Sequence, residues 1–297
     1  MSGVTQSKKL SLAWILLIIL TLIWGTSFIL IKKGLEAFSA GEVGALRIFS
    51  AGVVLLPIAF FKLKRANFIQ AFYIFIVGFV GSLIPAFLFA KAETQIDSGI
   101  AGVLNALTPL FVLLVGAMMF NQSITRRMSL GLFIGLVGTI ILITSGQSLV
   151  PANLNFYAFF ILLATICYGL NVNLIKFRLK GVGAITITSL SMVFVLPITG
   201  FYLFFISDFR THLASVPDAS YSFFYVVMLG VMSTAIAMVL FNKLVQLVSP
   251  VFASMVTYLI PIVALAWGIM DGELVLPRHY IGMVTILAGV YITTRTR

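Results

Sequence analysis

Residues 165–176 read TICYGLNVNLIK, and they repeat in mid-chain the pattern of residues 21–32, TLIWGTSFILIK. The two stretches share an aromatic residue, a glycine and a final lysine at matching positions: Trp24 with Tyr168, Gly25 with Gly169, and Lys32 with Lys176. Both are apolar runs in which only the last residue is charged. The match indicates that the chain consists of two related halves.

The repeat continues further along the chain in one register without gaps. Matching pairs occur at a constant spacing: Gly78 with Gly230, Ser82 with Thr234, Lys91 with Lys243, Asn105 with Thr257, Pro109 with Pro261, and Gly116 with Gly268. A single match of this kind is weak, whereas a series in one register is specific. We therefore expect two halves, residues 1–148 and residues 149–297.

Composition places the chain in a lipid environment. Hydrophobic residues make up 61% of it and charged residues only 9%, whereas a soluble domain carries about 25% charged residues. The formal charge of +11 does not indicate nucleic-acid binding, because the basic residues lie in short clusters between apolar runs. The single cysteine, Cys167, excludes an internal disulfide and a cysteine-rich metal site.

A helix that crosses a bilayer needs about 20 mainly apolar residues. This window predicts an all-α integral membrane protein with ten transmembrane helices, at about 10–31, 43–61, 68–90, 98–120, 128–145, 156–176, 184–206, 221–242, 250–270 and 278–294. A turn at 145–155 separates the fifth span from the sixth. Because each half then holds five spans, the second half is inverted in the membrane relative to the first. Such inverted repeats are typical of secondary transporters, whose binding site lies where the repeats meet.

Basic residues fix the expected orientation. With the N-terminus inside, most of them fall in cytoplasmic segments: Lys8, Lys9, Lys62, Lys64, Arg65, Arg126, Arg127, Lys176, Arg178, Lys180, Lys243, Arg295 and Arg297. The outer loops hold fewer: Lys32, Lys33, Lys91, Arg210 and Arg278. This asymmetry predicts that both termini are cytoplasmic.

Four segments carry a resemblance to a known family. They are LIWGTSF (22–28), GALRIFS (44–50), LTPLFVLL (107–114) and IPIVALAWGIMDGE (260–273). In order and spacing they resemble the EamA branch of the drug/metabolite transporter superfamily. The resemblance implies ten helices in two inverted five-helix repeats, a central cavity lined mainly by helices one, three, four, six, eight and nine, and export of metabolites or amino acids. The Gly-Glu pair that ends the family's fourth helix is kept at Gly272-Glu273, but the first half has Asn121-Gln122.

Polar and aromatic residues within the spans are the candidate solute-binding groups, because polar groups inside a membrane are costly. They are Trp24, Ser27, Asn105, Tyr168, Asn171, Thr234, Thr257 and Tyr258. Close packing of helices is the alternative explanation.

Four lysines at span ends, Lys32, Lys91, Lys176 and Lys243, are candidates for the two mouths or, alternatively, extend to lipid headgroups. Arg47 is expected to bond loop carbonyls or Glu42, and Gly131, Gly135 and Gly138 to pack the two repeats or to form a dimer face.

The absence of Asp and Glu from the middle of every predicted span argues against a proton relay, which usually needs such a group. We therefore expect uniport or exchange of small metabolites, such as amino acids or amphipathic drugs, by alternating access. The alternatives are a carrier of nucleotide sugars or lipid-linked solutes and, in another class, a membrane scaffold or receptor. The sequence has no cluster that would make it an enzyme.

The expected partners are a small-molecule solute and membrane lipids, with no nucleic acid and no cofactor. We expect a multi-pass protein of the bacterial cytoplasmic (inner) membrane, as a monomer or a homodimer.

Overall fold

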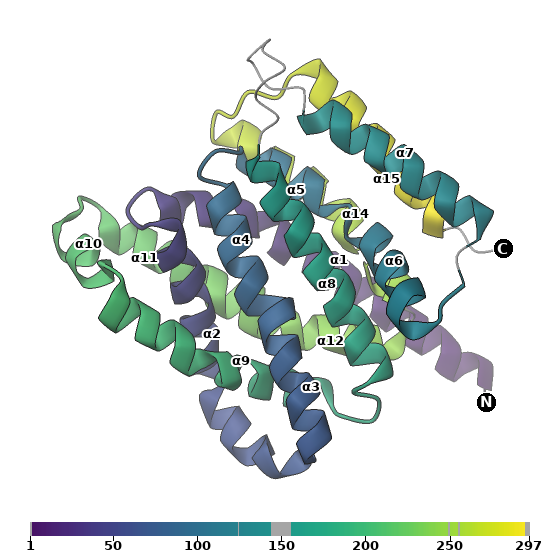
Figure 1. The fold of residues 1–297 in the computed structure, drawn as a ribbon, viewed down its shortest axis with the longest axis horizontal. Helices are drawn as coiled ribbons and strands as arrows, with labels where there is room; N and C mark the ends of the chain where they lie inside the picture. Colours follow the sequence, from purple (N-terminus) through teal and green to yellow (C-terminus); the bar gives the residue numbers. More distant parts are fainter. Residues whose placement is uncertain (1, 124, 144–155, 249, 255, 295–297) are drawn as a thin grey trace.

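The computed structural model describes residues 2–123, 125–143, 156–248, 250–254 and 256–294, and these residues form helices and loops without a strand (Figure 1). The expected turn at 145–155 and the expected boundary at 148 lie outside the described residues. In the first half the elements are α1 (Ser2–Leu35), α2 (Ala40–Lys62), η1 (Leu63–Arg65), α3 (Phe68–Gly78), η2 (Phe79–Leu83), α4 (Ile84–Ala92), α5 (Ser98–Asn105), α6 (Thr108–Phe120) and α7 (Arg126–Ile143).

The second half follows the same order. Its elements are α8 (Tyr157–Phe177), α9 (Ala184–Phe201), η3 (Tyr202–Ile206), α10 (Phe209–Ser215), α11 (Ala219–Met228), η4 (Leu229–Ile236), α12 (Ala237–Leu247), α13 (Pro250–Ser254), α14 (Val256–Met270) and α15 (Pro277–Thr294).

Seven stretches within the described residues are long and apolar enough to cross a membrane. They are Ser11–Leu35, Ala40–Lys62, Phe68–Ala92, Ser98–Phe120, Tyr157–Phe177, Ala184–Ile206 and Ala219–Leu247. They coincide with seven of the predicted spans. The other three predicted spans also coincide with helices (α7, α13 with α14, and α15), but they do not belong to these seven. The total of ten spans and the inverted repeat stay predictions.

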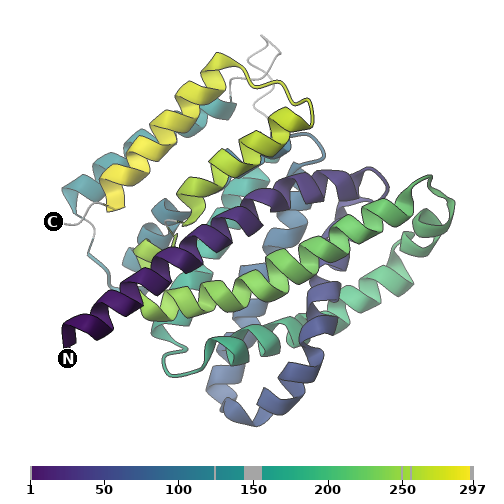
Figure 2. The same ribbon diagram turned by 180° about the vertical axis from the view of Figure 1, so that it is seen from behind.

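Helices from the two halves pack against each other in pairs. α2 packs on α9, α1 on α14, and α6 on α8. Figure 2 shows α1 crossing the molecule between the α14 and α12 segments, both of which it contacts. The core therefore lies between the halves.

α7 and α15 form a separate pair at one side of the molecule (Figure 1). A side chain at Gly289 has no room, because its Cβ would lie 2.6 Å from the carbonyl oxygen of Gly131. At Gly138 a Cβ would lie 2.6 Å from the backbone nitrogen of Ile286. Small residues allow two helix backbones to approach this closely. The glycine seam of α7 therefore packs on α15, in agreement with packing between the two halves, the first of the two alternatives.

Two breaks in helix geometry lie near the centre of the molecule. η2 and η4 are π-helical turns inside otherwise continuous spans, and such turns are frequent at functional sites. The span 98–120 is divided after Asn105, where the N–H groups of Ala106 and Leu107 bond to carbonyls three residues back. α6 then restarts with Thr108 and Pro109, and proline fits the first turn of a helix because no bond to its nitrogen is needed there.

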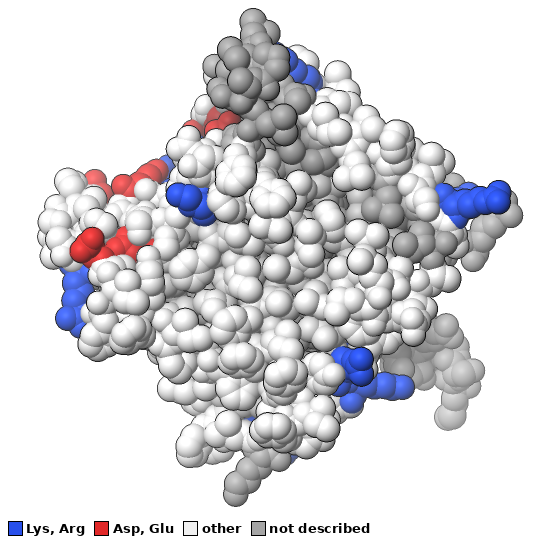
Figure 3. Space-filling model, viewed as in Figure 1, with Lys and Arg blue, Asp and Glu red and all other residues white. Residues whose placement is uncertain are grey.

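All eight acidic residues lie in the loops that follow α1, α4, η3, α10 and α14, or in the first turn of α2. In this region an ion pair joins Lys32 of α1 to Asp271, and a side-chain contact joins Glu42 of α2 to His212 of α10. We call this region the acidic end. On the face drawn in Figure 3, the red atoms lie only toward the upper left, whereas blue atoms appear at several edges.

Candidate functional site

One cavity lies between the halves, with a volume of about 70 Å³. The cavity is lined by residues of spans one, three, four, six, eight and nine, the helices that the family resemblance implies. The second span adds Arg47 and Ile48. Seven of the eight candidate solute-binding residues line this cavity: Trp24, Ser27, Asn105, Tyr168, Asn171, Thr234 and Thr257. Their role in binding stays a prediction, but the structure brings them together.

Tyr258 does not line the cavity, although the sequence placed it beside Thr257 in the same group. Neighbouring residues in a helix point about 100° apart. Thr257 faces the cavity from α14, so Tyr258 points to a different side of that helix.

Aromatic rings form much of the cavity wall. The Nε1–H of Trp24 donates a hydrogen bond to the carbonyl of Ser233 at 2.8 Å, which joins α1 to η4. The ring of Trp24 meets Phe241 edge-on at 5.0 Å, and Tyr168 stacks on Phe89 at 6.1 Å. These contacts fix flat apolar surfaces that suit an apolar or aromatic part of a solute.

Two polar atoms in the cavity wall have no hydrogen-bond partner among the described residues. They are Oγ of Ser82 and Oδ1 of Asn171, and both side chains are buried. Buried polar groups are almost always hydrogen-bonded, because an unsatisfied one costs about 1–3 kcal/mol. These two atoms therefore have unused hydrogen-bonding capacity in the wall of the cavity.

The contacts of Arg47 differ from the prediction that it bonds loop carbonyls or Glu42. It does not bond Glu42, whose carboxylate instead accepts bonds from the backbone of Ser39 and lies 2.9 Å from Nδ1 of His212. Arg47 is buried, lines the cavity, and donates its Nε–H to Oγ1 of Thr234 at 2.9 Å. No carboxylate of the described residues lies within ion-pair distance of the guanidinium. The cavity therefore contains a positive charge with no direct counter-ion.

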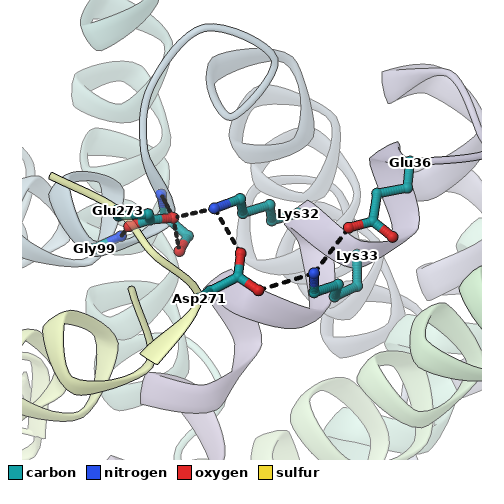
Figure 4. Close-up of polar contacts among 7 residues, drawn as sticks. Lys32, Lys33, Glu36, Gly99, Asp271 and Glu273 are labelled. Atoms are coloured by element: carbon teal, nitrogen blue, oxygen red, sulfur yellow. Dashed lines mark hydrogen bonds and ion pairs between the residues drawn. The ribbon is translucent and has the colours of Figure 1, made fainter. Parts of the chain in front are cut away.

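Lys32 is held in an ion-pair network at the acidic end (Figure 4). Its Nζ lies 2.7 Å from Asp271 and 2.9 Å from Glu273, and Lys33 joins Asp271 to Glu36. The side chain of Glu273 is only 3% exposed. Its carboxylate also accepts bonds from Oγ and N–H of Ser98, and from N–H of Gly99, so it caps the start of α5.

These contacts control ionisation of the two acids outside the spans. Bonds from Lys32 and Lys33 lower the pKa of Asp271. Burial by itself raises the pKa of Glu273, but the bonds from Ser98, Gly99 and Lys32 outweigh it and lower the pKa below its ordinary value. Both acids are therefore ionised at neutral pH and hold α1 to the turn after α14.

The other three candidate mouth lysines do not form ion pairs with described residues. Lys176, which matches Lys32, donates to the carbonyls of Val245 and Val248 at 3.2 and 2.7 Å. Lys91 is exposed and lies 5.7 Å from the centre of the Tyr157 ring, and Lys243 is exposed. Of the four, only Lys32 joins the two halves through ion pairs.

Gln122, the counterpart of Glu273 in the first half, forms hydrogen bonds with uncharged partners. Its Nε2 donates to Oδ1 of Asn173 at 3.0 Å, and Asn173 in turn donates to the carbonyl of Val112. At these matched positions Glu273 therefore forms an ion pair, whereas Gln122 forms hydrogen bonds with uncharged groups.

Two features were not predicted from the sequence: Arg47 lines the cavity, and Glu93, outside the cavity, is a buried acid. Glu93 lies just beyond the predicted span 68–90, and it is only 8% exposed. The spacing of the sequence does contain a signal for the burial of Glu93. Glu93 lies at helical spacing from Ser82, Ala86 and Phe89, and all four residues are buried.

Comparison with known proteins agrees with the geometry. The sequence profile of the EamA-like transporter family matches residues 11–144 and 155–295. An "Uncharacterized transporter" of Archaeoglobus fulgidus is 25% identical over 96% of this chain and 99% of its own length. The "Uncharacterized inner membrane transporter YedA" of Escherichia coli K12 is 26% identical over 93% of this chain and 88% of its own length.

A solved structure, described only as the crystal structure of a protein, has the same fold. It aligns with a TM-score of 0.67 at 16% identity and covers 95% of this chain and 96% of that one. At this identity the likeness shows the fold alone.

Proposed function

The chain belongs to the EamA-like transporter family and is a multi-pass membrane transporter, and from this premise we propose that it exports small solutes through the central cavity by alternating access. The observation that carries the proposal is the convergence of Trp24, Asn105, Tyr168, Asn171 and Thr234 on one cavity between the halves. Binding near the middle of the membrane, where two inverted repeats meet, is the arrangement that alternating access requires.

Three features support two inverted repeats of five helices each, divided near residue 148. The helix pairs are reciprocal, since the first span packs on the ninth (α1 on α14) and the sixth on the fourth (α8 on α6). The π turns η2 and η4 contain the matched residues Ser82 and Thr234. The family profile also matches the chain as two stretches of similar length. Two near-equivalent halves can exchange conformations at low cost.

The contents of the cavity indicate the solute class. Arg47 offers a buried positive charge, Asn171 offers a free acceptor, and the aromatic wall offers apolar surface. A zwitterion with an apolar side chain satisfies all three, because its carboxylate pairs with the guanidinium and its ammonium donates to Asn171. We therefore favour amino acids over amphipathic cations, which Arg47 would repel. Carriers of nucleotide sugars or lipid-linked solutes remain the second candidate.

Orientation follows from the loop charges. The acidic end is assigned to the outer side, because the opposite ends of the spans carry most of the lysines and arginines. The bacterial inner membrane is the proposed location, as it is for the relative YedA. Uniport and exchange are both compatible with the cavity.

Counterflow in liposomes tests the proposal. Purified protein in vesicles preloaded with unlabelled solute is supplied with labelled amino acids, their amides and nucleosides. We expect accumulation of an apolar amino acid and weak accumulation of its amide, which lacks the carboxylate. Counterflow of none of these solutes would contradict the proposal, and preference for nucleosides would favour the second candidate.

A matched pair of tryptophan variants tests the cavity itself. Trp24→Phe removes the bond to Ser233 at the cavity wall, whereas Trp14→Phe changes an exposed residue of the same helix, away from the cavity. We expect W24F to lower the counterflow rate by about two- to tenfold, the factor that one hydrogen bond provides. W14F serves as the control and is expected to leave the rate unchanged. Equal rates for the two variants would remove Trp24 from the site.

A further inference from the structure

Glu93 is a buried acid without a partner. It directly follows α4 at the acidic end, and only 8% of its surface is exposed. Neither carboxylate oxygen has a hydrogen-bond partner within the described part of the chain. An ionised carboxylate in such a position is very costly, and the usual outcome is that the group takes up a proton.

The groups around Glu93 do not neutralise it. Lys32 of α1 is bound to Asp271 and Glu273, and Arg47 of α2 is bound to Thr234. Glu273, in the turn after α14, is ionised and repels a second negative charge. Glu93 also caps the C-terminal end of α4, where the helix dipole disfavours an anion.

Further titratable groups lie around this region. α8, which packs along α4, brings Tyr168, and the loop after Glu93 brings Asp97, which lies with Lys32, Glu273 and His279 around one hollow. Burial and the negative charge of Glu273 raise the pKa of Glu93 well above its ordinary value. The positive charges of Arg47 and Lys32 lower this pKa, but their effect is smaller.

We propose that Glu93 is a proton-binding site that is occupied while the acidic end is closed and that releases its proton when this end opens. The proposal rests on the proposed function, in which this end opens once per cycle. On opening, water reaches the carboxyl group, its O–H bond breaks, the electron pair stays on the carboxylate and the proton passes to that water. On closing, the carboxylate takes a proton back from the same side.

Opening of the acidic end is therefore linked to the proton concentration on that side. A proton that binds only the closed state stabilises it, so acid favours closure and alkali favours opening. Acids are absent from the middle of the predicted spans. Glu93 lies outside that window, one residue past the end of α4, yet it is buried.

Infrared spectroscopy tests protonation directly and needs no solute. The chain contains four glutamates, so uniform labelling with ¹³C-glutamate assigns the carbonyl band of a protonated side chain to this residue type. We expect this band at pH 7 in the native chain and in the control Glu36→Gln, which changes an exposed glutamate of the same end. We expect it to be absent in Glu93→Gln. No such band in the native chain, or its persistence in E93Q, would overturn the proposal.

Distance measurements test the link to opening. In a Cys167→Ser background, spin labels at Thr94→Cys and Leu274→Cys occupy exposed positions in the two loops that flank this end. From pH 7 to pH 9 we expect the ratio of open to closed molecules to rise, by at most about tenfold per pH unit for one proton. This range lies above the ordinary pKa of histidine.

The glutamine of E93Q has the shape of the protonated acid. We expect the ratio of open to closed molecules of this variant to be independent of pH. A pH dependence that persists in E93Q would overturn the proposal. Both readouts are independent of transport, so a protein that shows them and yet fails in counterflow contradicts the proposed function and not the proton site.

Discussion

Lys32 and Glu273 are 241 residues apart in the chain and form an ion pair of 2.9 Å at the acidic end. The same carboxylate caps α5 through Ser98 and Gly99. One acid thus joins the first helix of the first half, the fourth span of the same half and the end of α14. Any movement that opens this end has to break several of these bonds together.

Removal of Glu273 is expected to cost more stability than removal of Lys32. Glu273→Gln places an amide against four donors that need an acceptor, at a site only 3% exposed, so we expect a loss of about 3 kcal/mol. Lys32→Gln removes a partner that is 32% exposed and screened by water, with a loss of about 1 kcal/mol. Thermal unfolding in detergent gives the order of Tm values. A lower Tm for K32Q than for E273Q would contradict this account.

Stability is expected to have a maximum at mildly acidic pH, because the acids act in opposite directions. Asp271 and Glu273 have lowered pKa values in the folded protein, so their ionised forms stabilise it. This contribution is fully present above their ordinary pKa values of 3.8 and 4.5. It is lost as the pH falls through the lower pKa values of the folded state. The raised pKa of Glu93 costs stability as the pH rises above 4.5. Tm measured against pH should rise and then fall.

Two variants separate the branches of that profile. Glu93→Gln removes the group responsible for the alkaline fall, so its Tm should stay higher at neutral pH. Asp271→Asn should weaken the acid branch alone. An alkaline branch unchanged in E93Q would show that another group causes it.

The glycine seam of α7 and α15 provides a test of packing. Gly289→Leu forces a side chain against the backbone of Gly131 and Gly135, and we expect a loss of about 3 kcal/mol from overpacking. Ala288→Leu adds the same side chain one residue earlier, on an exposed face. Its Tm should match that of the native chain. Similar Tm values for both variants would mean that the two helices do not pack as closely as described.

The bond between Arg47 and Thr234 is expected to position the guanidinium for the solute. Thr234→Val keeps the shape but leaves Nε–H without its acceptor, and we expect KM for a transported amino acid to rise by about three- to tenfold. Thr285→Val removes a hydroxyl that only bonds its own helix at the carbonyl of Ile281. KM should be unchanged in this control. Equal values for the two variants would argue against a role of Arg47 in binding.

Much of the fold was predictable from the sequence, because a bilayer imposes long apolar runs and the repeat fixes their order. The seven spans agree with prediction within a few residues at each end. The break after Asn105 and the π turns were not predictable, since hydropathy carries no information on the hydrogen-bond pattern within an apolar run.

The cavity was predictable where matched residues occur in both halves, as at Asn105 and Thr257. Arg47 was missed because the second span begins at Ala40 and not at residue 43, which puts this residue two turns inside the helix. Glu93 lies just past the end of a predicted span, and hydropathy gives no indication that an acid in this position is buried. Its burial depends on the loops that cover it, and these meet only in the folded chain.

The π turns η2 and η4 also bear on how the cavity changes shape. A π turn holds one residue more per hydrogen-bonded ring than an α turn. Conversion of either turn to α geometry would advance the following segment by about 1.5 Å and rotate it by about 100°. Such a register shift would turn the residues beyond η2, Phe89 and Glu93 among them, toward a new neighbour. Each half of the transporter thus contains, beside its cavity wall, one surplus residue that can be transferred along the helix.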